Sequence, residues 1–299
     1  MRKTYKKKKG GNPIKNTKNT NKNNSKNNKV CIIMSDNREI TDNYENAEYH
    51  SLAVAINYNY AKKHGYNFIY YNPFIPNEHK ITNNNLGTNK KHKVNSFQSK
   101  LNKYRYPSWT KLITLFNTLL EKYAYVVYLD TDAIIVNNID LHKYLNDISY
   151  SRGSKDSDLK FLIDKPYSDG PCAGGIIIKN SDISKRAVKY WWNYDIPEFD
   201  KKHSFEQEAL RSMVVHNKNS NMEPYIGIID DISFQPKEGQ FIRHVSHMEA
   251  EKRIPIFKCW YETLYNKDTF KKTIDEIKKH NVKKVDIIKL EQTLQDTFI

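Results

Sequence analysis

Cysteines, long apolar runs and secretion signals are scarce or missing in this chain. Three cysteines occur in 299 residues, and none forms a Cys-x-x-Cys pair: Cys31, Cys172 and Cys259. This spacing argues against a disulfide framework and a zinc ribbon, so reduced thiols are expected. No apolar run approaches the roughly 20 residues of a membrane span, and the N-terminus lacks the apolar stretch of a signal peptide. The sequence therefore predicts a cytoplasmic protein without a membrane span.

Acidic residues are absent from the first 29 positions, which hold eleven of the 49 lysines and arginines. The net charge of +15 therefore belongs mainly to this Lys/Asn-rich segment, and the rest of the chain carries only +4. Such low-complexity sequence buries almost nothing, so residues 1–29 are predicted to be a disordered tail. Non-specific attraction of polyanions to this tail is one alternative function. No recognition motif accompanies the tail, so no specific nucleic-acid partner is expected.

The remaining sequence alternates short apolar runs with amphipathic helical patterns, which predicts an α/β fold with a mostly parallel sheet. The expected strands cover residues 30–34, 67–71, 125–129, 133–136, 161–163, 174–178, 225–229 and 241–245. A polar stretch at 72–106 is expected to be a functional loop or an insertion. Helical stripes at 270–277 and 287–294 close the chain. We therefore expect one domain at 30–258, followed by a helical extension at 259–299.

Two carboxylates follow the strand predicted at 125–129. Asp130 and Asp132 are two residues apart on an extended chain, so both side chains can face one cleft. Ligands of parallel sheets bind beyond the carboxyl ends of the strands, and carboxylate oxygens suit a hard cation such as Mg²⁺ or Mn²⁺. Such a cation can neutralise a diphosphate leaving group. The alternative, in which the pair only caps the strand, is disfavoured because apolar runs lie on both sides of it.

Several segments resemble one enzyme family. The most specific is Tyr-Leu-Asp-Thr-Asp-Ala-Ile at 128–134, preceded by Trp-Thr-Lys. The other segments lie at 57–66, 172–180 and 206–207. Together, these segments resemble the galactosyl/mannosyl transferase family, which includes the xyloglucan xylosyltransferases. The similarity covers roughly residues 30–255 in order, and it implies a GT-A fold and a retaining, metal-dependent glycosyltransferase.

The resemblance also implies roles for individual residues. It places Glu206 and Gln207 beneath the donor sugar, where they would support a developing oxocarbenium charge, and it places Gly174 in a strand that contacts the donor. A structural alternative exists for Gln207, which completes a capping box with Ser204 at the start of a helix.

Three more residues are candidates for donor binding. Ser35 and Asp36 end the first strand, where a nucleotide lies in a GT-A fold. An aspartate that only caps the loop is the alternative. Lys111 lies on the helix before the aspartates. It is a candidate for a phosphate contact, although the alternative of a solvated lysine is favoured for it.

The sequence departs from the family pattern in two places. Cys172 stands where the family usually has Asn, a donor-sugar contact. The family also places one His on the metal and a Lys five residues later on the diphosphate. His247 with Lys252 keeps this spacing, whereas His244 has Glu249 there, so we favour His247 as the third ligand and Lys252 as the diphosphate contact. Alternation along a strand turns the two histidine rings to opposite sides, so one of them is expected to join the metal. A pair of surface histidines is the alternative.

The expected donor is a nucleotide sugar, and the expected acceptor is a glycan or a glycoprotein. A UDP-sugar is favoured over a GDP-sugar, although UDP-galactose, UDP-glucose, UDP-xylose and GDP-mannose all fit the pattern.

A phosphatase of the haloacid dehalogenase type is the alternative enzyme. It also has Asp-x-Asp after a hydrophobic strand, and Asp230 and Asp231 imitate its later acidic motif. Members of that family have Thr or Val at the position of Ile134. Their domain also normally starts with the strand that precedes the Asp-x-Asp motif. Here a long α/β segment precedes the motif, which favours the transferase.

Overall fold

Strand β1 (Val30–Ser35) is the first element of the computed structural model. The residues that the structure describes are 29–80, 97–100, 104–163, 170–194, 205–216, 225–229, 241–246 and 248–299. Some sequence-based expectations fall outside these ranges. They concern residues 1–28 of the tail, much of the 72–106 segment, Ser204, Asp230, Asp231 and His247.

An eight-stranded sheet forms the centre of the molecule, in the order β12-β2-β1-β5-β9-β8-β10-β7. Its other strands are β2 (Asn67–Phe74), β5 (Tyr125–Leu129), β7 (Tyr150–Arg152), β8 (Leu159–Ile163), β9 (Pro171–Lys179), β10 (Ile226–Ile229) and β12 (Val282–Asp286). Strands β12, β2, β1 and β5 are parallel, as are β8 and β10, whereas β9 and β7 run antiparallel to their neighbours. The prediction of an α/β fold with a mostly parallel sheet is confirmed. A separate short pair consists of β3 (Phe97–Gln98) and β4 (Tyr104–Arg105).

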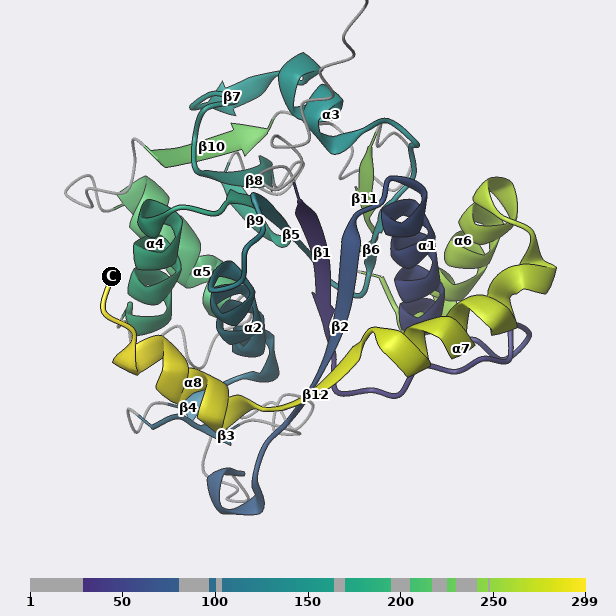
Figure 1. Ribbon diagram of the computed structural model, residues 1–299, viewed down its shortest axis with the longest axis horizontal. Helices are drawn as coiled ribbons and strands as arrows, with labels where there is room; N and C mark the ends of the chain where they lie inside the picture. Colours follow the sequence, from purple (N-terminus) through teal and green to yellow (C-terminus); the bar gives the residue numbers. More distant parts are fainter. Residues whose placement is uncertain are drawn as a thin grey trace, which may run out of the picture.

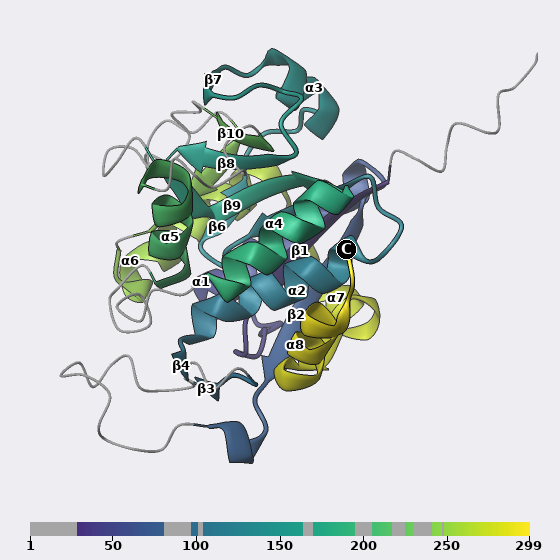
Figure 2. The same cartoon turned by 90° about the vertical axis from the view of Figure 1, so that its left-hand side faces the viewer.

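Helices cover both faces of this sheet (Figure 1). One face carries α1, α6 and α7, and the other carries α2, α4, α5 and α8; α2, α4 and α8 face the viewer in Figure 2. The helices are α1 (Tyr49–Lys63), α2 (Thr110–Leu119), α3 (Leu141–Asp147), α4 (Asp182–Asn193), α5 (Phe205–Arg211), α6 (Ala250–Leu264), α7 (Phe270–His280) and α8 (Ile287–Asp296). Short 3-10 turns lie at Asn77–His79, Pro107–Trp109 and Lys267–Thr269, and a π-helical turn at Ser212–His216. Among the described residues, no helix is both long enough and apolar enough to cross a membrane.

Local sequence signals set the helix boundaries. Ser181 caps α4, because its hydroxyl accepts a hydrogen bond from the backbone N–H of Ser184 at 3.1 Å. Asp140 caps α3 in the same way. Helix α1 ends just before Gly65, whose φ of 67° suits glycine best. Pro107 opens the 3-10 turn that leads into α2.

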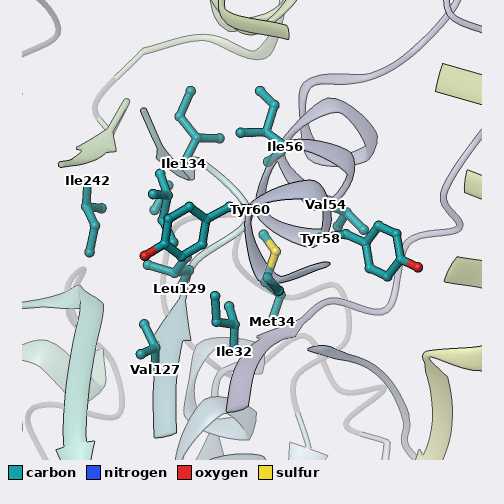
Figure 3. Packing of buried hydrophobic residues seen from close by; sticks show 14 of the residues in the cluster. Ile32, Met34, Val54, Ile56, Tyr58, Tyr60, Val127, Leu129, Ile134 and Ile242 are labelled. Atoms are coloured by element: carbon teal, nitrogen blue, oxygen red, sulfur yellow. The ribbon is translucent and has the colours of Figure 1, made fainter. Parts of the chain in front are cut away.

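Side chains from α1 pack against the sheet in one of the two buried cores (Figure 3). Ile56 and Tyr60 of α1 lie near Met34 of β1 and Leu129 of β5, and all four are essentially inaccessible to solvent. Burying such a side chain contributes about 1.5–3 kcal/mol. Because helices cover both faces, β1 and β5 are apolar on both sides. This packing anchors the two strands that lead to Asp36 and Asp130.

A two-stranded antiparallel ribbon follows directly after β5. Strand β6 (Ala133–Ile135) pairs with β11 (Ile242–His244), so that Ala133 lies opposite His244. Asn57 of α1 is completely buried beside this ribbon. Its amide donates to the carbonyl oxygen of Ala133 at 2.9 Å and accepts from the N–H of Ile135 at 2.9 Å. These bonds hold the ribbon against α1, and so help to fix the place of His244.

Strand β12 is the main departure from the predicted elements. The sequence predicts only helices at 259–299, yet β12 pairs with β2 at the edge of the sheet. Its sequence, Val-Lys-Lys-Val-Asp, contains no apolar run, because an edge strand is partly exposed and lysines there discourage pairing with other chains. The boundary expected at residue 258 falls inside α6.

Lys160 is a buried lysine on β8 whose protonation should affect stability. Its side chain is 1% exposed, and its ammonium group donates to the carbonyl oxygen of Ser157. Burial lowers the pKa of Lys160 to about 8, whereas an unfolded lysine titrates near ~10.4. Between these pH values the unfolded chain holds a proton that the folded protein has lost. This lysine therefore makes the free energy of unfolding rise with pH, by up to about 1.4 kcal/mol per pH unit.

We expect denaturant unfolding to show this rise in the wild-type protein relative to a Lys160→Met variant. Measurements at about pH 8 and about pH 10 bracket the window. Methionine fills a similar buried space without titrating, so the contributions of other groups cancel in the difference. A difference that stays constant between the two pH values would contradict this prediction.

Candidate metal and nucleotide site

Asp130 and Asp132 lie where the chain leaves β5. The backbone N–H of Asp130 donates to the carbonyl oxygen of Gly174 on β9 at 2.9 Å, and the N–H of Ala133 donates to the carbonyl oxygen of Asp130 at 2.9 Å. The chain therefore turns immediately after β5, between β9 and the β6–β11 ribbon. This is the carboxyl edge of the parallel strands, where the sequence predicts a ligand.

Asp130, Asp132 and His244 form a cluster that could hold a cation. Their ligand atoms all lie within 4.8 Å of one another, and Nε2 of His244 is 3.0 Å from Oδ1 of Asp132. Two carboxylates and one imidazole suit a divalent cation such as Mn²⁺ or Mg²⁺. The donor set therefore fits the cation that the sequence predicts.

His244 is the histidine that the structure places in this cluster. It ends β11, and its side chain is 9% exposed. The next residue, Val245, donates its backbone N–H to the carbonyl oxygen of Asp132 at 2.8 Å, which fastens the end of the strand beside the aspartates. The spacing argument favours His247, which lies outside the described residues. That preference stays untested, and the described geometry supports His244 as a ligand.

Opposite charges balance one another in the cluster. Burial lowers the pKa of His244, but the interactions with Asp132 and Cys172 together outweigh burial and raise this pKa well above its usual value. Burial raises the pKa of Asp132, but His244 together with the charges of Arg253 and Lys111 outweighs burial and holds this pKa below its usual value. For Asp130 burial prevails and the pKa is raised, although the charge of Lys111 opposes this. Because Nε2 must be unprotonated to bind a cation, cation binding would release a proton.

Lys111 joins Asp130 to the helices on the α2 face. Its side chain is 4% exposed, and Nζ lies 3.0 Å from Oδ1 of Asp130 and 2.8 Å from Oε1 of Glu206. The ammonium group also donates to the carbonyl oxygen of Ala173 at 3.2 Å. Burial lowers the pKa of Lys111, but the two carboxylates outweigh this and raise it. The alternative of a solvated lysine is therefore wrong, because this charge is buried between two acids.

Glu206 and Gln207 begin α5 and lie beside β9. The carboxylate of Glu206 accepts a hydrogen bond from the hydroxyl of Ser108 as well as the lysine contact. Oε1 of Gln207 accepts the backbone N–H of Ala173 at 2.8 Å. Ser204, the other half of the alternative capping box, lies outside the described residues. The structure therefore brings both predicted catalytic residues to the stretch of β9 that the lysine contacts.

A cavity of about 260 Å³ lies beside Asp130 and Asp132. Ser35 and Asp36, at the end of β1, line this cavity together with Lys111. The hydroxyl oxygen of Ser35 is buried and has no hydrogen-bond partner among the described residues. A buried polar atom normally has a partner, so a ligand in the cavity would satisfy this hydroxyl.

Asp36 combines the predicted site position with a structural role. Nε of Arg38 lies 3.0 Å from its Oδ1, and the hydroxyl of Thr131 donates to its Oδ2 at 3.0 Å. Burial raises the pKa of Asp36, but the bonds from Arg38 outweigh this and lower it. The ionised carboxylate thus ties the loop after β1 to the residue between the two aspartates. Asp36 therefore stabilises the loop, as the alternative interpretation expects, and it also lines the cavity.

Arg253 is a cation at the site that the sequence analysis missed. Its Nη1 lies 3.1 Å from Oδ2 of Asp132, and its guanidinium group lies 4.9 Å from the ring centroid of Tyr49, which also lines the cavity. Lys252, the predicted diphosphate contact, is 69% exposed and pairs with Glu249 at 2.9 Å. Spacing along the sequence could not choose between these neighbours, because adjacent residues of a helix point to different sides.

Gly174 lies directly beneath the ring of His244. A Cβ added to Gly174 would come within 2.3 to 2.7 Å of three ring atoms. Contacts this short do not occur, so only glycine lets the ring rest against the backbone of β9. The predicted donor contact of Gly174 stays a prediction, and the structure adds that this residue makes room for a candidate ligand.

The variant Gly174→Ala is therefore expected to displace the ring and to weaken Mn²⁺ binding at least ~10-fold, as loss of a supporting contact at a metal site does. Electron paramagnetic resonance of free Mn²⁺ measures the affinity. Gly175→Ala is the matched control, because its Cβ would meet the flexible end of Leu162 at 2.4 Å. A folded Gly174→Ala protein with wild-type Mn²⁺ affinity would show that His244 does not depend on this gap.

No family model matches the chain, and no curated protein sequence matches it. Solved structures with a similar arrangement exist at low sequence identity. One is a glycosyltransferase involved in the glycosylation of the major capsid of PBCV-1, with 12% identity and a TM-score of 0.49; the match covers 77% of this chain and 99% of that one. Another is the glycosyltransferase GlyE of Streptococcus pneumoniae TIGR4, with 13% identity and a TM-score of 0.42; the match covers 85% of this chain and 64% of GlyE.

A third is a point mutant of Drosophila β1,4-galactosyltransferase 7 in complex with manganese, UDP-Gal and xylobiose, with 11% identity and a TM-score of 0.35; the match covers 87% of this chain and 83% of that one. All three are glycosyltransferases. Because the identities and TM-scores are low, the function has to be inferred from this chain's own site. The specific resemblance to the galactosyl/mannosyl transferases stays a prediction.

Proposed function

We propose that this chain is a metal-dependent glycosyltransferase of the GT-A fold, which transfers a sugar from a nucleotide-sugar donor to an acceptor hydroxyl. One observation carries the proposal. Asp130, Asp132 and His244 converge within 4.8 Å at the carboxyl edge of the sheet, beside a cavity that Ser35 and Asp36 line. A cation site next to a cavity at this edge suits a nucleoside diphosphate.

The bound cation would neutralise the diphosphate and so assist its departure as a leaving group. The chain's own residues bind and orient the donor around it. The buried hydroxyl of Ser35, which has no partner among the described residues, is a candidate for a contact with the nucleoside. Lys111 holds Asp130 and Glu206 in fixed positions through its two ion pairs. Arg253 adds a positive charge beside Asp132.

On the donor-sugar side, we propose that Glu206 and Gln207 face the sugar. Lys111 keeps the carboxylate of Glu206 close to Asp130, and a negative charge there would stabilise positive charge that develops at the anomeric carbon. Gln207 is fixed by its bond to β9. We further propose retention of anomeric configuration, a UDP-sugar in preference to a GDP-sugar, and a glycan or glycoprotein acceptor. Lys252 and His247 remain candidates for the diphosphate and the metal.

Calorimetry with nucleoside diphosphates tests this proposal. UDP and GDP are each titrated into the full chain with and without Mn²⁺. We expect Mn²⁺-dependent binding of at least one of them, with UDP the tighter ligand, and loss of binding when EDTA is added. Binding of neither nucleotide by the folded protein would contradict the proposal.

Phosphatase activity is the outcome that the alternative enzyme predicts. A haloacid dehalogenase would hydrolyse p-nitrophenyl phosphate and would not need a nucleotide. Such hydrolysis without sugar transfer would overturn the proposed function. Binding of polyanions that disappears when residues 1–29 are deleted would belong to the tail and would leave the enzyme proposal intact.

A further inference from the structure

Both ring nitrogens of His244 face a side chain that has chemistry of its own. Nε2 lies 3.0 Å from Oδ1 of Asp132, on the cation side. Nδ1 lies 3.6 Å from Sγ of Cys172, on the opposite side of the ring. Cys172 is 1% exposed, and its sulfur also accepts the backbone N–H of Gly174 at 3.4 Å. The position of the thiol is thus fixed by β9, and the thiol contacts the ring at Nδ1, away from the cation site.

Binding of a cation through Nε2 sets a condition on the other nitrogen. A neutral imidazole carries one proton, and a cation on Nε2 requires that proton to be on Nδ1. Histidines that bind metals almost always donate this N–H to an acceptor, which fixes the orientation of the ring. The sulfur of Cys172, 3.6 Å from Nδ1, is in position to accept this N–H.

We propose that Cys172 is a positioning residue, whose sulfur accepts the Nδ1–H of His244 and thereby keeps Nε2 directed at the cation. The proposal rests on the metal site of the proposed function. It also gives the residue at this place a role different from the donor-sugar contact that the family resemblance implies for Asn. Sulfur is a weak acceptor, but Gly174 and β9 leave the ring little freedom, so a weak bond is enough to select one orientation.

Two substitutions of Cys172 test whether the site needs an acceptor that faces Nδ1. Cys172→Ala removes the acceptor, whereas Cys172→Ser keeps an acceptor of similar size. Cys31→Ala is the matched control, because Cys31 is an equally buried free cysteine in β1 of the same sheet. The full-length proteins are titrated with Mn²⁺ and followed by electron paramagnetic resonance, and their melting temperatures are recorded.

We expect Cys172→Ala to weaken Mn²⁺ binding about 10-fold, at the lower end of the effect of removing such a partner. Cys172→Ser should stay within about threefold of the wild type, because a hydroxyl also accepts the Nδ1–H. Cys31→Ala should leave the affinity unchanged. Melting temperatures of the two alanine variants should fall by similar amounts, because both lose a buried thiol.

Three results would overturn the proposal. Wild-type Mn²⁺ affinity in Cys172→Ala would show that the thiol does not position the ring. Equal losses in the Ala and Ser variants would show that an acceptor at this position does not restore binding, so that a hydrogen bond to Nδ1 is not what positions the ring. If Cys172→Ala lost Cd²⁺ binding but kept Mn²⁺ binding, the thiol would be a cation ligand and not a positioning residue. Asp132→Asn is measured in parallel, and unchanged Mn²⁺ affinity there would mean that the metal site itself has failed.

Discussion

Replacing either aspartate of the metal cluster with asparagine is expected to abolish Mn²⁺ binding and nucleotide-sugar turnover. Asp130→Asn and Asp132→Asn each keep the size of the side chain but remove a negative charge from the cluster. A bound cation supplies several kcal/mol of transition-state stabilisation, so turnover should fall at least ~1000-fold. The fold should persist, because neither side chain is part of the apolar core and Lys111 keeps its ion pair with Glu206 when Asp130 is replaced.

The control for this prediction is Asp182→Asn, an aspartate at the start of α4 whose side chain is 74% exposed. It should retain Mn²⁺ binding and turnover. Turnover is followed by the release of nucleoside diphosphate, and circular dichroism checks the fold. Full activity in both cluster variants, or activity that EDTA does not diminish, would rule out a role for the aspartates in holding a cation.

Replacing Lys111 with methionine is expected to destabilise the protein strongly as well as to reduce turnover. Lys111→Met leaves the carboxylates of Asp130 and Glu206 without the cation that now lies 3.0 Å and 2.8 Å from them. Breaking a buried ion pair by removing one partner costs about 3–5 kcal/mol. For a chain of this size that corresponds to a fall in melting temperature of roughly 10 °C.

Lys160→Met is the matched control, because it replaces another buried lysine with the same residue. Lys160 donates to a backbone carbonyl, and its pKa is lowered to about 8 by burial, so its loss near neutral pH should not destabilise the fold comparably. Calorimetric melting of both variants measures the difference. Equal melting temperatures for Lys111→Met and the wild type would show that the two ion pairs do not hold the site together.

The sequence predicts the elements that build the sheet edge because their signals are local. Strands β1 and β5 are short apolar runs, and each is followed at once by polar site residues such as Asp36 and Asp130. The end of α1 at Gly65 and the start of α2 after Pro107 are also set by nearby residues. Strand β12 was not predicted from the sequence. Its composition does not indicate a strand, and it forms one because it pairs with β2.

The cation and thiol contacts of the site could not be predicted because they join distant parts of the chain. Arg253 reaches Asp132 because α6 packs beside α1. Cys172 meets His244 across 72 positions in sequence, through a gap that Gly174 leaves. Spacing arguments within one segment, such as the choice between the two late histidines, carry no information about such contacts.

Consumption of a nucleotide sugar tests the proposed function most directly. The full chain is incubated with UDP-galactose, UDP-glucose, UDP-xylose or GDP-mannose in the presence of Mn²⁺, and release of the nucleoside diphosphate is measured. The proposed function predicts release from at least one donor, loss of release with EDTA, and no release by Asp132→Asn. Release that continues in Asp132→Asn, or a folded wild-type protein that binds Mn²⁺ and consumes none of the donors, would contradict it.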